Sequence, residues 1–512
     1  MANINKSNVA ICQTVQLGEL KKTVDSELIV PDYLPDVKKI IRVDAFPVTS
    51  DVKAEREKIV ITGQIEYAIV YLPESSQSLR CLRSISDFEQ AFEARGVDES
   101  CRVFTTDKLS YLNCKILNSR KLMIGVGIVF DTTVERDQEF SLIAPAQCTE
   151  YNVECVEMSH DCSTFAGEGR SLFSVEEELE INDAKQPAAM LVYTSCTPVI
   201  LDSKTVGGKI LVKGELKVRS LYLIDMETGK LDSVENSVPF NQIVEVPGID
   251  ENSLCVFDIK CLSSDYALYE NSAGENRIIS LNANIQIDCA AYQTVQLELV
   301  SDAYCPVSAF SVHNSTVDFE RQCDTVSETV SVKGELATEE DIEAVLSTSG
   351  VAYVTGCSVE DGALVVKGDV SISAIYKESE GEVEGDDTTI PFSAELALPL
   401  TCSEYRCRAQ AELVNISYII SSARTVELRA TVQVSGVVRC VNQVELIDDI
   451  QISDEDPHRS NDYLVLYYSK PNEKLWDIAK RYNSTVAKLK SVNNLSDDFT
   501  EGQMILIPRS CN

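Results

Sequence analysis

Ile210-Leu-Val-Lys-Gly214-Glu-Leu-Lys-Val-Arg-Ser-Leu-Tyr222 is the stretch that decides the fold of this chain. From Ile210 to Val218, apolar residues alternate with charged ones, and this period of two is typical of a strand with one buried and one solvated face. Gly214 falls on the apolar face, where a missing side chain indicates a bulge or the close approach of another backbone. The stretch therefore predicts a half-buried β-strand with a glycine at its centre.

The same pattern occurs twice more, in Ile59–Tyr71 and in Leu364–Tyr376, each with a Gly followed eight residues later by a Tyr. The three glycines are separated by 151 and 154 residues; they are Gly63, Gly214 and Gly368. An Arg followed by alternating apolar residues comes 57, 63 and 56 residues after these glycines, at Arg120, Arg277 and Arg424. Two landmarks that repeat in register predict tandem copies of one β unit.

Each unit is expected to contain a short helix-like piece ahead of its glycine strand. These pieces are predicted at Pro31–Ile41, Pro187–Leu191 and Asp341–Leu346, because a proline such as Pro35 suits the start of a helix and an acid such as Asp36 favours its first turn. The predicted fold is mainly β, with three tandem all-β domains that are sandwich- or barrel-like. The predicted units are 10–160, 165–315 and 318–450, followed by an acidic linker at 451–462 and a small domain at 463–512.

The last fifty residues carry a different pattern. Leu475, Ile478, Ala479 and Tyr482 are spaced as i, i+3, i+4 and i+7, which predicts one apolar face of a two-turn helix. Ser484 or Thr485 can cap a second short helix, and Met504–Ile507 reads as a strand ended by Pro508. Trp476 is expected to pack in this small core rather than to serve as a sugar platform. The predicted core of the domain is Leu475, Trp476, Ile478, Ala479, Tyr482, Leu489, Ile505 and Ile507.

This order of residues resembles the LysM module, a β-α-α-β domain that in most settings binds N-acetylglucosamine-containing glycans such as peptidoglycan. The resemblance implies a groove built from the turn before the first helix and the loop after the second. Here these are Pro471, Asn472, Glu473 and Lys474, and Asn493, Asn494, Leu495 and Ser496. The family's usual Gly-Asp-Thr or Gly-Asp-Ser turn is replaced by Asn472-Glu473-Lys474. Glycan and protein therefore both stand as candidate ligands, and the larger, charged turn favours a protein.

The whole layout resembles the SipL-like, SPOCS-domain spore coat morphogenesis proteins of endospore-forming bacteria. The resemblance rests on the LysM core and on three further features: the Pro31/Pro35/Asp36/Ile40 entry, the Gly63/Tyr71 pair with its copies, and Asp302-Ala-Tyr304-Cys-Pro306. It implies a non-enzymatic scaffold or adaptor of spore coat assembly, which docks through its LysM domain to the morphogenetic ATPase of the coat's basement layer. Such proteins are made in the mother-cell cytoplasm and gather at the forespore surface. The alternative is a peptidoglycan-binding envelope protein of the spore cortex or cell wall.

Composition narrows the class of partner. The net charge is −36; residues from Tyr463 onward contain seven Lys/Arg and five Asp/Glu, so residues 1–462 carry −38. An acidic body argues against nucleic acid or an anionic membrane surface as partner. No apolar run is long enough for a signal peptide or a membrane span, so a cytoplasmic protein without membrane insertion is expected. The eighteen cysteines are scattered in apolar contexts, as at Cys114 and Cys289, and buried reduced thiols are expected.

The sequence offers no candidate catalytic residue, metal site or cofactor site. The one cluster of metal-ligand types, Cys148, Cys155, His160 and Cys162, lacks the closely spaced Cys pairs of a zinc site. Gly207-Gly208-Lys209 lacks the flanking residues of a phosphate loop and is expected to form a hairpin turn. A wall hydrolase with a LysM anchor would need a secretion signal and a catalytic constellation, and the sequence indicates neither. A binding protein, not an enzyme, is therefore predicted.

Overall fold

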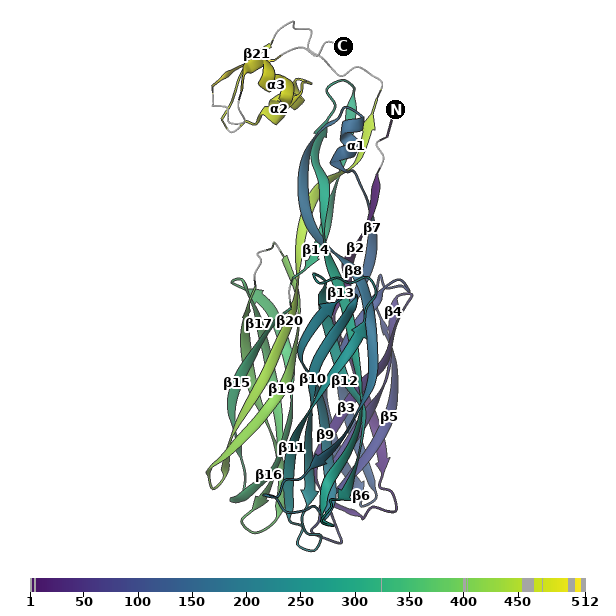
Figure 1. The fold of residues 1–512 in the computed structure, drawn as a ribbon, viewed down its shortest axis with the longest axis vertical. Coiled ribbons are helices and arrows are strands. Elements are labelled where there is room, and N and C mark those ends of the chain that lie inside the picture. The colour runs from purple at the N-terminus through teal and green to yellow at the C-terminus, as the bar shows by residue number, and fades with distance from the viewer. Residues whose placement is uncertain are drawn as a thin grey trace.

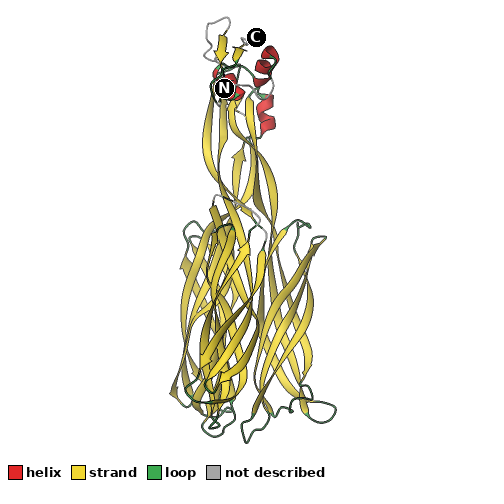
Figure 2. Cartoon of the chain, turned by 90° about the vertical axis from the view of Figure 1, so that its left-hand side faces the viewer, coloured by secondary structure: helices red, strands yellow, loops and turns green. Residues whose placement is uncertain are grey.

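The computed structural model describes residues 2–3, 6–323, 325–398, 402, 404–453, 465–471, 473–495 and 502–507. Three elongated β units lie side by side, a narrower stalk of strands rises from them, and a small domain with two helices sits near the tip of the stalk (Figure 1). Figure 2 shows that the strands run along the long axis of the molecule and that the described helices lie near the tip. The predicted mainly β fold is confirmed.

Each unit contains two antiparallel sheets of three strands. The strands of the first unit are β2 (Ser7–Ile29), β3 (Val37–Glu55), β4 (Lys58–Pro73), β5 (Arg80–Glu93), β6 (Arg102–Asn118) and β7 (Lys121–Leu142). Their sheets have the orders β3-β4-β5 and β2-β7-β6, and one apolar core fills the space between them. The unit is therefore a β-sandwich.

The second and third units repeat this topology. The second consists of β8 (Glu154–Glu180), β9 (Met190–Val206), β10 (Lys209–Leu223), β11 (Leu231–Glu245), β12 (Leu254–Glu270) and β13 (Asn276–Tyr304), preceded by the short helix α1 (Pro145–Glu150). The third consists of β14 (Phe310–Gln322), β15 (Val326–Ala337), β16 (Ile342–Glu360), β17 (Ala363–Glu378), β18 (Val383–Ala397), β19 (Glu404–Ser422) and β20 (Thr425–Ile452). The sheet orders are β9-β10-β11 and β8-β13-β12, then β16-β17-β18 and β15-β20-β19. Farther along β20, β14 and the two-residue strand β1 (Ala2–Asn3) also pair with it, so this last sheet has five strands in all.

The landmark glycines lie at the centres of β4, β10 and β17, and the close approach expected there is confirmed. A Cβ built on Gly214 would lie 2.3 Å from Cζ of Phe240, its cross-strand partner on β11, and 2.5 Å from the carbonyl oxygen of Val199 on β9. The neighbouring strand also bulges beside this glycine. Gly63 and Gly368 are covered in the same way, by Phe88 and Phe392. An aromatic ring thus fills the space that each glycine leaves on the core face.

The landmark arginines hold the loop that joins the first strand of each unit to the opposite sheet. Arg277 is the most buried of them, and its guanidinium donates to the carbonyl oxygens of Ile181, Asn182 and Lys185 at 3.3, 3.1 and 2.9 Å. Arg120 donates to the carbonyl of Leu34 in the corresponding loop. The repeated arginine therefore has a structural role in closing the sandwich.

The helix-like pieces predicted in this region are wrong. Residues 31–36 form a loop, and β3 begins directly after it at Val37. The amide of Val37 donates to the carbonyl of Ser119 at 2.8 Å, and that of Ile342 donates to Ala423 at 2.7 Å. Because these amides bond to the opposite side of the sandwich, they are not available for helical i→i−4 bonds, and tertiary pairing overrides the local helix signal. Gly207 and Gly208, in contrast, form the predicted hairpin turn, both with positive φ.

The first and last strands of each unit extend beyond the sandwich as a two-stranded ribbon, and the three ribbons form the stalk (Figure 1). In the third unit the first strand is interrupted, so β14 lies in the ribbon and β15 in the sandwich. Ile11, Leu299 and Leu446, one from each ribbon, share an apolar cluster. Strand ends differ from the unit boundaries predicted from the sequence. β8 begins at Glu154 and β14 at Phe310, before the predicted unit starts at 165 and 318. β20 ends at Ile452, two residues past the predicted end of the third unit.

Three different residues occupy one repeat position at the base of the stalk. Glu135, Tyr292 and Arg439 each follow the landmark arginine of their unit by fifteen residues. The hydroxyl of Tyr292 lies 2.9 and 3.0 Å from the two carboxylate oxygens of Glu135, and Arg439 forms an ion pair with the same carboxylate. All three side chains are buried. The units therefore meet around a common axis through complementary, not identical, residues.

Fifteen of the described cysteines form no disulfide, and seven of these are buried while eight are partly buried. Cys402 and Cys440 instead form a disulfide, with their Cα atoms 5.7 Å apart, a pairing that the sequence did not predict. Within the described ranges, no helix has the length and hydropathy needed to cross a bilayer.

Candidate binding site in the C-terminal domain

The C-terminal domain has the expected β-α-α-β order: β21 (Val465–Tyr468), α2 (Leu475–Arg481), α3 (Val486–Asn493) and β22 (Met504–Ile507). β21 and β22 pair antiparallel, and the hydroxyl oxygen of Thr485 caps α3 by accepting from the Lys488 amide at 3.1 Å. Six of the eight residues assigned to the core are buried, and the other two are partly buried. The partly buried pair is Trp476 and Tyr482. Pro508 lies outside the described residues.

The turn before α2 is braced by Glu473. Its carboxylate accepts from the hydroxyl of Tyr467 at 2.8 Å and from the amide of Lys470 at 3.1 Å, and it pairs with Arg481 at 3.0 Å. Burial alone would raise the pKa of Glu473, but these hydrogen bonds outweigh it and lower the pKa. Glu473, which stands where the family usually has Asp, thus holds the shape of the turn from inside.

Lys474 and Pro471 are the exposed members of this turn. Lys474 is the N-cap residue of α2, and its amide donates to the carboxylate of Asp477 at 3.2 Å. Asn472 lies outside the described residues. The turn therefore presents a cation, Lys474, to solvent.

The loop after α3 also contains both residues that are bonded within the domain and an exposed residue. The side-chain amide of Asn493 donates to the carbonyls of Leu489 and Leu506 at 2.9 and 2.6 Å and accepts from the Leu506 amide at 2.6 Å, so it ties α3 to β22. Leu495 packs against the domain core, whereas Asn494, in the left-handed conformation with φ 49°, is exposed. Ser496 lies outside the described residues.

Both loops are thus anchored on the same two-stranded sheet, one through Tyr467 on β21 and the other through Leu506 on β22. The described candidates separate into exposed residues, Pro471, Lys474 and Asn494, and bracing residues, Glu473, Asn493 and Leu495. Only the exposed ones are free to meet a ligand without loss of a bond within the domain.

Family models match the chain in four places. A SipL, SPOCS domain model matches residues 36–117, 188–268 and 341–421, and a LysM domain model matches residues 470–508. The chain belongs to the SipL family of SPOCS-domain proteins. Each SPOCS match covers the four strands that follow the first strand of a unit, for example β3 to β6, and leaves the ribbon strands of the stalk outside. No curated protein and no solved structure matches the chain.

The family names are those of a sporulation protein and of a peptidoglycan-binding module. SPOCS and LysM domains are binding domains rather than catalytic ones.

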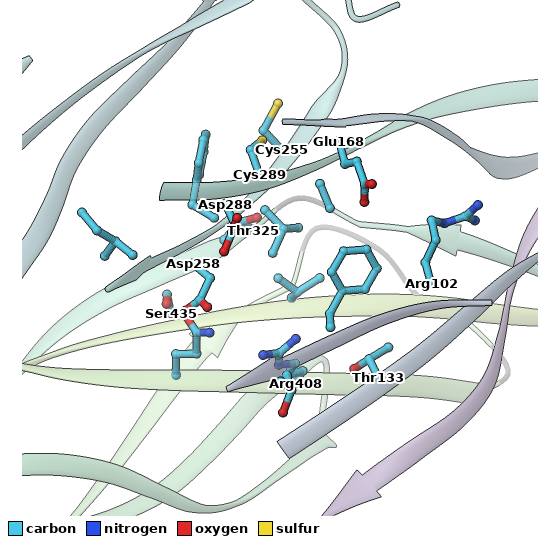
Figure 3. A pocket seen from close by; sticks show the side chains of 18 of the residues that line it. Arg102, Thr133, Glu168, Cys255, Asp258, Asp288, Cys289, Thr325, Arg408 and Ser435 are labelled. Atoms are coloured by element: carbon cyan, nitrogen blue, oxygen red, sulfur yellow. The ribbon is translucent and has the colours of Figure 1, made fainter. Parts of the chain in front are cut away.

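A partly open cavity of about 1,030 Å³ lies between the three sandwiches (Figure 3). Arg102, Asp258 and Arg408 line it, and they come from β6, β12 and β19, which are corresponding strands of the three units. Burial, reinforced by the charge of Asp258, raises the pKa of Glu412 in its wall to about 7. The charges around the cavity have mixed sign. Among the described residues no group of three His, Cys, Asp or Glu side chains could hold a metal ion.

The sequence missed a further set of contacts made by the C-terminal domain. Trp476 Nε1 donates to the carboxylate of Asp302, at the end of β13, over 2.7 Å, and the ring of Trp476 meets Tyr304 edge-on with centroids 4.9 Å apart. In the sequence, Asp302 and Tyr304 stand out only as part of the Asp302-Ala-Tyr304-Cys-Pro306 motif. No local signal could have found this contact, because its partners are 174 residues apart.

Proposed function

We propose that this protein is a non-enzymatic scaffold or adaptor in endospore coat assembly. Its LysM domain binds a protein, the morphogenetic ATPase of the coat's basement layer, at the forespore surface, which it reaches from the mother-cell cytoplasm. The three SPOCS units form a rigid, acidic body that carries the LysM domain at the tip of the stalk. Neither the body nor the domain supplies catalytic residues in this function.

The observation that carries the proposal is the architecture of the LysM turn. Glu473 is used internally, through Tyr467 and Arg481, and Lys474 is left exposed at the start of α2. The turn that the resemblance gives for glycan-binding LysM domains, Gly-Asp-Thr or Gly-Asp-Ser, is absent here. An exposed cation beside a braced turn suits an acidic or polar patch on a protein. The rigid turn also lowers the entropic cost of binding.

Peptidoglycan is the second candidate ligand, and one observation favours it: the fold and the core residues of the domain are those of the LysM family, matched over residues 470–508. In that case the protein acts as an envelope protein of the spore cortex or cell wall. The exposed Asn494 then supplies the polar contact to the sugar.

The test compares the full-length chain with two charge-reversal variants. Lys474→Glu changes the exposed turn, and Lys53→Glu makes the same change on an exposed strand of the first unit. Binding is measured by biolayer interferometry against the purified coat ATPase with ATP, and by co-sedimentation with purified peptidoglycan. We expect ATPase affinity to fall at least tenfold for Lys474→Glu only. Sedimentation of the wild type with peptidoglycan, without ATPase binding, would refute the adaptor function in favour of the envelope one.

A further inference from the structure

We propose that the tip of the second SPOCS unit is a docking site for the chain's own LysM domain. In the docked state Asp302 and Tyr304 cover the face of α2 that carries Trp476 and Lys480, while the turn at Lys474 stays open to ligands. Figures 1 and 2 both show the LysM domain beside the upper end of the stalk. The proposal goes beyond the function given above, because it assigns a role to the SPOCS body whichever ligand the LysM domain binds.

Asp302 is the polar centre of the docking site. One of its carboxylate oxygens accepts from Trp476 Nε1 at 2.7 Å, and the other pairs with Lys480 Nζ at 2.5 Å. Trp476 and Lys480 are four residues apart on α2 and so lie on the same side of the helix. Burial alone would raise the pKa of Asp302, but the bonds from Lys480 and Trp476 outweigh it and lower the pKa.

Tyr304 is the apolar centre. Its side chain is 4% exposed and packs in the same apolar cluster as Leu475, Ile478 and Leu489 of the LysM domain. Its hydroxyl donates to the carbonyl oxygen of Ser484, in the link between α2 and α3, at 2.8 Å. The ring of a residue from the second SPOCS unit therefore completes the core of the LysM domain.

The contacts of Asp302 and Tyr304 account for the position of Trp476 and Lys480 on one face of α2. A tryptophan and a lysine on one face of a small domain would remain in water if the domain were free, and the indole N–H would have no protein partner. At the stalk tip the indole has both a hydrogen-bond acceptor and an aromatic neighbour. The carboxylate of Asp302 and the ring of Tyr304 meet groups on α2, and the hydroxyl of Tyr304 meets the link that follows α2.

Docking assigns separate roles to two surfaces of the LysM domain. Pro471, Lys474 and Asn494 are exposed in the docked state and can bind a partner without release of the domain. A ligand that required Trp476 would first have to displace Asp302 and Tyr304. The stalk thus fixes the direction in which the ligand-binding turn is presented.

The chain supplies its own probe, because Trp476 is the only tryptophan. We would measure acrylamide quenching and the emission maximum of Trp476 in the full-length chain, and compare Asp302→Lys with Asp265→Lys. Asp265 is an exposed aspartate on β12 of the same unit, so the control makes the same charge change away from the tip. Asp302→Lys should raise the quenching constant at least twofold and shift emission to longer wavelength, while Asp265→Lys should change neither.

A charge swap distinguishes release from damage to the LysM domain. The double variant Asp302→Lys/Lys480→Asp restores an opposite-charge pair at the tip, and it should recover at least half of the lost protection of Trp476. Wild-type quenching in Asp302→Lys would overturn the proposal, and so would a swap variant that is quenched as strongly as the single variant. Neither outcome depends on the ATPase or on peptidoglycan, so failure of docking and failure of the proposed function are separable.

Discussion

Replacing Arg439 by methionine should destabilise the junction of the three units more than any single surface change. Arg439 is 8% exposed and forms an ion pair with Glu135, which is 1% exposed. Burial opposes the charge on Arg439, but Glu135 and Tyr292 nearby outweigh it and raise the pKa of the guanidinium. Methionine keeps much of the apolar volume of the arginine and removes its charge.

The expected loss of stability follows from the buried carboxylate that remains when Arg439 is removed. Glu135, which is 1% exposed, would keep the hydrogen bonds from the Tyr292 hydroxyl and the Cys12 thiol but would lose the cation that pairs with it. Breaking a buried ion pair by removal of one partner costs about 3–5 kcal/mol. For units of about 150 residues, 1 kcal/mol lowers the melting temperature by roughly 2–4 °C. Arg439→Met should therefore melt roughly 6–20 °C below the wild type.

The assays are thermal melting and urea unfolding, both followed by far-UV circular dichroism, because the single tryptophan reports only on the LysM domain. Glu135→Gln and the double variant Glu135→Gln/Arg439→Met complete a thermodynamic cycle. Since the double variant buries no unpaired charge, it should be more stable than Arg439→Met by about 2 kcal/mol or more. Additive losses in the double variant, or a loss below about 1 kcal/mol in Arg439→Met, would refute the argument that the axis depends on complementary charge.

Three further changes test separate parts of the body. Gly214→Ala places a methyl group against the ring of Phe240 and a backbone carbonyl, and it should cost about 1–3 kcal/mol in urea unfolding, whereas Gly18→Ala, with open space around it, should not destabilise. Burial raises the pKa of Glu412 to about 7. Below pH 4 the carboxyl is protonated in the folded and the unfolded chain, so its burial costs no stability. As pH rises to 7 the carboxyl ionises first in the unfolded chain, and the free energy of unfolding falls. Glu412→Gln should thus be neutral at pH 4 and stabilising by up to about 3 kcal/mol at pH 8, and equal effects at both pH values would contradict this. Arg277 bonds the loop carbonyls through Nη1 and Glu275 through Nε, whereas lysine has one nitrogen for both partners; Arg277→Lys should therefore lower the melting temperature of the second unit, measured by calorimetry.

The sequence was sufficient where the signal was local or periodic. Alternation along Ile210–Tyr222 predicted a half-buried strand, and Gly214 predicted a close approach, because both depend on the two-residue period of a strand. The identity of the approaching group, Phe240, came only from the structure. A phenylalanine does recur 24 to 26 residues after each landmark glycine, at Phe88, Phe240 and Phe392.

Local signals failed where distant segments competed for the same groups. Pro35 and Asp36 are good helix starters, yet the next amide, on Val37, bonds across the sandwich to Ser119. In the C-terminal domain, the resemblance to LysM modules assigned Asn493 to the groove. The structure uses both ends of its amide to join α3 to Leu506, so it braces the groove instead. No spacing in the sequence distinguishes a bracing polar residue from an exposed one.

The residues around the axis explain why three units of one type occur in a single chain. Three separate copies of one unit would bring three identical residues together at the axis, and three buried glutamates or three buried arginines would repel one another. In one chain the position can hold Glu135, Tyr292 and Arg439, and their charges are satisfied mutually. The same asymmetry extends to the tip of the stalk, where the second unit supplies Asp302 and Tyr304 for one LysM domain. Covalent linkage of the units thus permits an axis of complementary residues and a single, oriented position for the ligand-binding turn.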